Sequence, residues 1–154
     1  MPLRFFFIEG STPHKILLLL LKFLSNELSF DPISKMLEFF KFKNDRKFLD
    51  YIYNKTDILV NTSIYEGFPN TITEAVSFNC LIITSKSFGG YSDIILNNNF
   101  GLLYKTGNIN ELSQKLKFAI RNFKNCKIKI KNAKKNLIKL SKKNDTYIKF
   151  FNKI

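Results

Sequence analysis

Two carboxylates, Glu66 and Glu74, flank a short loop that contains Gly67 and Pro69. Asn70 is a good helix N-cap, so we expect a helix to begin there. The free N–H groups of a first helical turn favour a bound phosphate. An ionised carboxylate accepts hydrogen bonds but donates none, so the hydroxyl groups of a sugar suit both glutamates. The residues around this loop therefore indicate a ligand in which a sugar is joined to a phosphate.

The segments on either side of the loop predict how these residues are held in place. Asp57–Asn61 and Cys80–Thr84 are apolar runs of strand length, and Asn70–Asn79 between them has the character of one short helix. A strand, loop, helix and strand form a βαβ unit, which belongs to a parallel sheet covered on both faces. Ligands of such sheets bind beyond the carboxyl ends of the strands. The loop with Glu66 lies at that edge.

These residues resemble a known signature. The run from Glu66 to Ala75, EGFPNTITEA, is similar to the E-x7-E donor-site motif of family 4 glycosyltransferases, which have the GT-B architecture of two Rossmann-like domains. Three flanking stretches are similar to the same family: TDILVNTS at 56–63, CLIITSKSFGGYSDII at 80–95 and NNNFGLLYKTGNINELSQKL at 97–116. The resemblance implies a Rossmann-like α/β fold, a parallel sheet with helices on both faces, in a single partial GT-B domain.

The resemblance also implies site residues and an activity. Glu66 is expected to be the catalytic residue and to contact the hydroxyls of the donor sugar, and Glu74 is expected to bind the ribose hydroxyls. The full donor-binding set that we expect is Glu66, Gly67, Phe68, Pro69, Asn70, Thr71, Glu74, Gly89 and Gly90. The implied reaction transfers a sugar from a nucleoside-diphosphate sugar to a glycan or lipid-linked acceptor, with retention at the anomeric carbon.

Charge divides the chain into two parts. The 154 residues carry a net charge of +13, and residues 124–154 hold eleven lysines and one acid, Asp145. We expect a nucleotide-sugar-binding domain over 1–123, followed by basic C-terminal helices over 124–154 that pack on it. The basic part is either a solvated lysine-rich face or a surface for anionic lipid. No motif for nucleic acid is present, so no nucleic-acid partner is expected.

Other features suggest where the protein works. Cys80 and Cys126 form no disulfide framework, and no stretch is typical of a signal peptide or a membrane span, which favours a cytoplasmic protein, with the inner membrane face as a peripheral site. His14 is the single histidine, and no cluster suggests a metal, so neither a metal nor a cofactor is expected.

The resemblance covers the second domain of the family and lacks its opening, where a basic pair neutralises the donor diphosphate. Transfer would then need a first domain, for example one encoded separately. Two alternatives stay open. One is a truncated, inactive remnant or an interaction module that kept the fold, and the other is a basic protein that binds a membrane or another polyanion.

Overall fold

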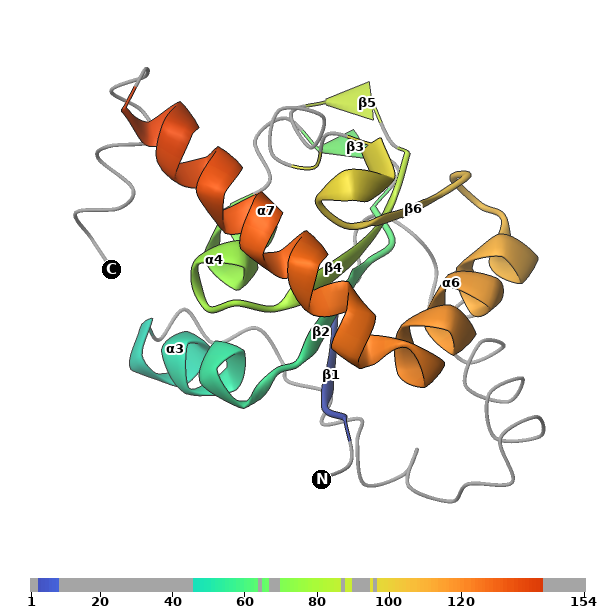
Figure 1. Ribbon diagram of the computed structural model, residues 1–154, viewed down its shortest axis with the longest axis horizontal. Coiled ribbons are helices and arrows are strands. Elements are labelled where there is room, and N and C mark those ends of the chain that lie inside the picture. Colours follow the sequence, from blue (N-terminus) through green and yellow to red (C-terminus); the bar gives the residue numbers. More distant parts are fainter. Residues whose placement is uncertain are drawn as a thin grey trace.

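In the part of the chain that the structure describes, four parallel strands form a central sheet. The computed structural model describes residues 3–8, 46–63, 65–66, 70–86, 88–89, 95 and 97–142. The sheet has the order β1-β2-β4-β6. Its strands are β1 (Phe5–Ile8), β2 (Ile58–Asn61), β4 (Leu81–Ser85) and β6 (Leu102–Tyr104), and every neighbouring pair is parallel (Figure 1). The predicted α/β fold with a parallel sheet is confirmed.

The central strands are buried from end to end, as expected for a parallel sheet that is covered on both faces. Alternate residues enter different hydrophobic clusters because successive side chains of a strand point to opposite faces. In β2, Leu59 belongs to one cluster, whereas Ile58 and Val60 belong to the other. The apolar runs of the sequence are thus explained by burial on two sides.

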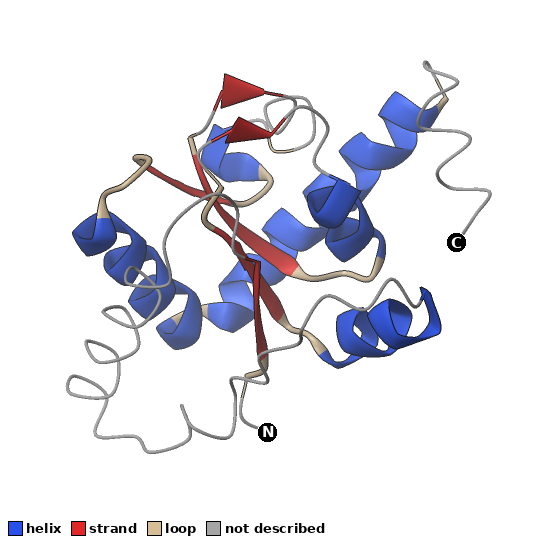
Figure 2. Ribbon diagram, turned by 180° about the vertical axis from the view of Figure 1, so that it is seen from behind, coloured by secondary structure: helices blue, strands red, loops and turns tan. Residues whose placement is uncertain are grey.

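Among the residues that the structure describes, four helices cover these faces (Figure 2): α3 (Arg46–Lys55), α4 (Asn70–Ser77), α6 (Ile109–Arg121) and α7 (Phe123–Ser141). The first cluster joins α3, α4 and the later part of α7 to the sheet, through residues such as Tyr53, Ile72 and Leu137. The second cluster joins α6 to the opposite face, through residues such as Leu112 and Leu116. Helices on both faces complete the predicted three-layer arrangement.

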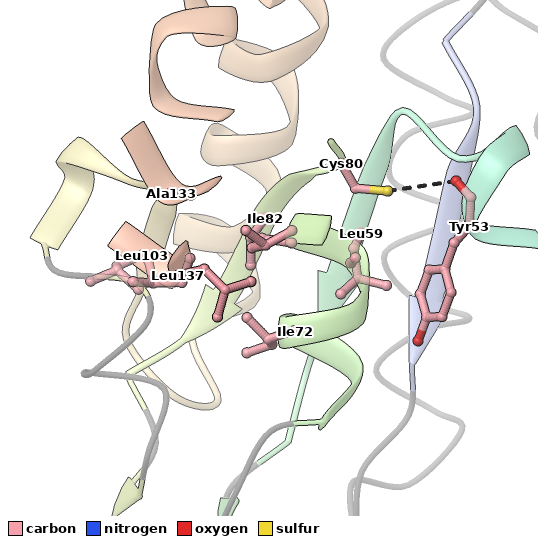
Figure 3. Close-up of a cluster of buried hydrophobic side chains, with 11 residues drawn as sticks. Tyr53, Leu59, Ile72, Cys80, Ile82, Leu103, Ala133 and Leu137 are labelled. Carbon is pink, nitrogen blue, oxygen red and sulfur yellow. Dashed lines mark hydrogen bonds between the residues drawn. The ribbon is translucent and has the colours of Figure 1, made fainter. Parts of the chain in front are cut away.

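The first cluster is shown in Figure 3, where Ile72 of α4 and Leu137 of α7 lie beside Ile82 of β4. Cys80 lies at the edge of this cluster and is 1% exposed. Its thiol donates to the carbonyl oxygens of Thr56 at 3.3 Å and Tyr53 at 3.8 Å. Together with burial of its apolar surface, these contacts tie the end of α3 to the start of β4.

Helix α7 contributes to both clusters. Cys126 packs with α6 on one face of the sheet, whereas Ala133 and Leu137 pack with α4 on the other. The boundary that we predicted at residues 123 and 124 coincides with the first turn of this helix. Inside the described residues, the basic segment is therefore part of the core of the domain.

The predicted segments agree with the described elements to within a few residues. Helix α6 begins after its N-cap Asn108, whose side chain accepts from the Glu111 amide at 3.0 Å. Of the basic segment that we expected over 124–154, the part described is helix α7, which begins at Phe123. Residues 143–154 of that segment lie outside the described residues, as do Gly67, Phe68, Pro69 and Gly90.

Candidate functional site

A second, two-stranded sheet lies beyond the carboxyl ends of the main strands. Strand β3 (Tyr65–Glu66) follows β2, and strand β5 (Phe88–Gly89) follows β4. The two pair in parallel, with Glu66 opposite Gly89 (Figure 1). This pairing brings together two segments that we predicted separately for the donor site, the one before α4 and the one after β4. They lie at the edge where ligands of such sheets bind.

Four buried residues with polar groups lie at the carboxyl ends of the main strands, and we call them the polar floor: Asn61, Ser63, Ser85 and Tyr104. Asn61 ends β2 and is 1% exposed, and its side-chain oxygen accepts from the Ser63 amide at 3.0 Å. Tyr104 at the end of β6 donates its hydroxyl to the Asn61 carbonyl at 3.3 Å. The Ser85 hydroxyl donates to the Ser63 carbonyl. These bonds link the carboxyl ends of three strands and fix the points from which both site loops leave.

Two phenols near this edge stay protonated. Burial raises the pKa of the Tyr104 hydroxyl above its ordinary value, although its contact with Ser85 acts the other way. Tyr53 of α3 is 1% exposed, and burial followed by the Glu74 carboxylate raises its pKa as well. Both hydroxyls therefore remain hydrogen-bond donors throughout the physiological pH range.

Helix α4 begins at Asn70, as the sequence predicted. Asn70 is exposed and Thr71 is half-buried, so the first turn of the helix faces the surface at the carboxyl edge of the sheet. Glu74 lies one turn further on and is 8% exposed. Of the three expected site residues on this helix, Asn70 and Thr71 are accessible to solvent, whereas Glu74 is buried.

Glu74 has a cationic partner in the structure. Nη1 of Arg46, at the first position of α3, donates to Oε1 of Glu74 at 2.7 Å. The same guanidinium lies against Asp50 one turn along α3, with Nε 3.0 Å from Oδ1. A carboxylate this deeply buried is costly unless it is paired and hydrogen-bonded. Arg46 provides that pairing and ties α3 to α4.

Arg46 and the polar floor are the parts of this site that sequence reasoning missed. The pairing of Arg46 with Glu74 joins residues 28 positions apart, and no local pattern connects them. The floor left a weak signal, because the apolar run of β2 ends in Asn61-Thr62-Ser63 and that of β4 ends in Thr84-Ser85. Polar residues directly after two buried strands mark the edge of a sheet at which a site can form.

No cluster of three or more potential metal ligands exists among the residues that the structure describes. Within the same residues, no helix has the length and apolar character required to cross a membrane. At this edge, the structure describes the Glu74 carboxylate, which accepts from Arg46, and the first turn of α4, which begins at Asn70.

Solved structures with the same fold are glycosyltransferase domains. The C-terminal domain of a glycosyl transferase group 1 family protein, LpcC, from Francisella tularensis has 19% identity and a TM-score of 0.68, and the match covers 90% of this chain and 84% of that one. TarM from S. aureus, solved in complex with fondaparinux, alpha-GlcNAc-glycerol and UDP, has 19% identity and a TM-score of 0.72 over 99% of this chain.

A glycosyltransferase from Rickettsia africae has 22% identity and a TM-score of 0.63 over 98% of this chain. The chain spans 35% of the length of TarM and 48% of that of the Rickettsia protein. No curated protein sequence matches this chain.

The sequence itself matches a family model. The model described as glycosyl transferases group 1 aligns with residues 20–136, which include α3, α4, both site loops and most of α7. This match covers most of the chain, and the fold agrees with that of GT-B C-terminal domains. The chain belongs to the glycosyl transferases group 1 family.

Proposed function

We propose that this chain is the donor-binding part of a glycosyltransferase that uses a nucleoside-diphosphate sugar. The observation that carries the proposal is the register of β3 and β5, which sets Glu66 opposite Gly89 at the edge where α4 begins. Glu66 binds the donor sugar, the first turn of α4 faces the phosphates, and Glu74 accepts from the ribose hydroxyls. Transfer proceeds with retention to a glycan or lipid-linked acceptor.

The nature of the nucleotide is suggested by related folds. TarM and HepE from Anabaena were both solved in complex with UDP. UDP and UDP-sugars are therefore the first members of the panel to test, followed by GDP and GDP-sugars. Titration calorimetry of the whole chain should give saturable binding to at least one of them. If no member binds at millimolar ligand, the chain is an inactive remnant or an interaction module.

Transfer requires a second domain. Donor and acceptor must be held together for reaction, and positive charge must offset the diphosphate as it leaves. We propose that an acceptor-binding domain, joined to this one or encoded separately, holds the acceptor. A basic pair like the one in the opening of the family's second domain would supply the positive charge. This chain by itself should therefore bind the donor but transfer no sugar to an acceptor. Sugar transfer by the purified chain alone would show that the catalytic groups are wrongly placed in this proposal.

A lysine-lined groove along α7 suggests a second binding function. Four lysines of α7, Lys127, Lys131, Lys134 and Lys135, line a groove of about 640 Å³ together with Phe123, Ile130, Ile138, Asp57 and Asn79. Asp57 precedes β2 and Asn79 precedes β4, so the groove lies at the amino edge of the sheet, opposite the donor edge. Ile128 and Ile138 of the same helix are 58% and 41% exposed.

We propose that this face attaches the protein to an anionic membrane surface. Positions 124, 127, 131, 135, 138 and 142 recur at the three- and four-residue spacing that places side chains on one side of a helix. Lysines near an anionic bilayer each contribute about 1 kcal/mol to attachment. Exposed isoleucines between them add an apolar contact. Peripheral attachment at the cytoplasmic face would concentrate the protein at the surface that holds a lipid-linked acceptor.

A further inference from the structure

We propose that Arg46 is a positioning residue of the donor site, which holds the Glu74 carboxylate in the orientation that receives the ribose hydroxyls. This inference rests on the proposed function and adds a residue to it. The Glu74 side chain is 11% exposed, so it cannot be kept in place by water alone. One of its oxygens, Oε1, is held at 2.7 Å by Nη1 of Arg46.

The geometry leaves a role for a ligand. A carboxylate has two oxygens with about four acceptor positions, and the Arg46 N–H and the Tyr53 hydroxyl fill at most two of them. Among the residues that the structure describes, Nη2 of Arg46 is buried and has no hydrogen-bond partner. An unpaired buried donor is costly, and an oxygen of a bound ligand would relieve that cost. The pair therefore retains both acceptor and donor capacity for a hydroxyl-bearing molecule.

The charge of the pair also matters. A carboxylate beside the phosphates of a nucleotide repels them, and this repulsion is strong where the surroundings exclude water. The Arg46 guanidinium is permanently charged and offsets the charge of Glu74 at close range, and because Asp50 shares the same guanidinium, the three side chains together keep one negative charge. A paired Glu74 therefore repels the diphosphate less than an unpaired carboxylate would, and can still accept from the ribose.

Arg46 is itself held in place from two sides. Its Nε lies 3.0 Å from Asp50 on the same helix, and its side chain is 40% exposed, so it reaches from the surface inward to Glu74. Buried Tyr53, one turn beyond Asp50, faces the same carboxylate. Helix α3 thus presents three polar side chains to Glu74 or its partner. Arg46 is the one that carries the compensating charge.

The test measures how well the protein distinguishes ribose from deoxyribose. Wild-type protein should bind UDP or GDP about tenfold or more tightly than the 2′-deoxy form, because a hydrogen bond to a charged acceptor is lost. Arg46→Lys keeps the charge but presents a mobile ammonium in place of the planar fork. We expect this variant to lose most of the discrimination. Arg46→Met should lose it and also weaken binding of the ribonucleotide.

Two further variants separate positioning from general effects. Lys47→Met removes one positive charge from the neighbouring, exposed position of α3 and should leave the discrimination unchanged. In a Glu74→Gln background, Arg46→Lys should have almost no additional effect, because both changes act on one interaction. Thermal melts of each variant identify any loss of folding, and Arg46→Lys, which keeps the positive charge, allows the measurement if Arg46→Met unfolds.

The outcomes distinguish this inference from the proposed function. If the wild-type protein binds neither UDP nor GDP, the proposed function fails and the inference fails with it. If the wild type distinguishes ribose from deoxyribose and both Arg46 variants do so equally well, only the inference is overturned, and Arg46 is a purely structural tie between α3 and α4. Independent, additive effects of Arg46→Lys and Glu74→Gln would overturn it too.

Discussion

Helices α4 and α7 pack against each other, but they differ in whether their charged side chains are buried or exposed. The eight residues of α4 include five buried ones, and Glu74 is among them. The nineteen residues of α7 include three buried ones, Cys126, Ala133 and Leu137, and its lysines remain at the surface. Helix α4 packs on the sheet and also contacts α7 and Arg46 of α3, whereas α7 is buried along one narrow stripe.

This difference in coverage explains the difference in chemistry. A charge on the covered helix must find a fixed partner, which for Glu74 is Arg46, and a charge so fixed can position a ligand. Charges on the exposed helix stay hydrated and act together as a field. Lys134 is an intermediate case, since its Nζ donates to the Ser77 carbonyl and the Asn79 side chain at 3.0 Å at the end of α4.

The largest effect, on stability, is expected when a buried side chain of α7 is truncated. Leu137 is fully buried between α4 and the sheet, so Leu137→Ala should lower the free energy of unfolding by about 2–5 kcal/mol. The matched control is Ile138→Ala at the next position, 41% exposed, for which we expect about 0.5 kcal/mol or less. Chemical denaturation measures both. Equal losses would mean that α7 has no distinct buried side.

The exposed face of α7 is tested by its charge. Replacement of Lys124, Lys131 and Lys135 by Gln should remove about 3 kcal/mol of attachment to anionic vesicles. Glutamine at Lys105, Lys115 and Lys117 removes the same charge from β6–α6 and should have little effect. Co-sedimentation at increasing salt should show the attraction weakening as charges are screened.

Deletion of residues 124–154 would not test this surface, because Cys126, Ala133 and Leu137 belong to the core. The protein would lose its fold along with its lysines. Binding that is equal for neutral and anionic vesicles, or absent for anionic vesicles at low salt, would identify the face as an ordinary solvated surface.

The buried acid of α4 is tested by nucleotide binding. Glu74→Ala removes an ionised acceptor, so donor affinity should fall by about ten- to a hundredfold, which corresponds to roughly 1.5–3 kcal/mol. Glu74→Gln should cost less, because the amide keeps one acceptor oxygen. Calorimetry gives the affinities and circular dichroism checks the fold. Wild-type affinity in a folded Glu74→Ala protein would leave Glu74 as a structural partner of Arg46 alone.

The smallest effect concerns the thiol of Cys80, which belongs to the same hydrophobic cluster as α4 and α7. Burial, assisted by the nearby Asp57 carboxylate, raises the pKa of Cys80 to about 12. The unfolded thiol has a pKa of about 8.5. The folded value is the higher one, so the thiol's contribution to stability is complete below about pH 8.5 and is lost as the pH rises towards 12. The stability difference between wild type and Cys80→Ala should therefore shrink above about pH 9.

A thiol reagent provides a direct check of the same point. Cys80 and Cys126 are each 1% exposed, and burial raises the pKa of both. Native protein at about pH 8 should therefore react at neither thiol, and denatured protein should react at both. Rapid labelling of Cys80 in the native state would contradict the tight packing of α3 against β4.

The sequence by itself determined the elements and the edge at which they act. Periodicity and turn residues within about ten positions place β2, the start of α4 at Asn70 and β4, and the EGFP run marks the edge of the sheet. These features depend on neighbours along the chain, so local propensity is sufficient to reveal them. Hydrophobic runs also showed a sheet that is buried on both faces.

Only the tertiary structure decided which residues meet. The pairing of Arg46 with Glu74, the register of Glu66 opposite Gly89, and the place of α7 in the core each join segments far apart in the chain. Such contacts depend on how helices and strands pack, and an arginine in a helix looks from sequence like one more solvated cation. Glu74 is 8% exposed in the folded domain, and this burial makes that arginine necessary, because a buried carboxylate must be paired.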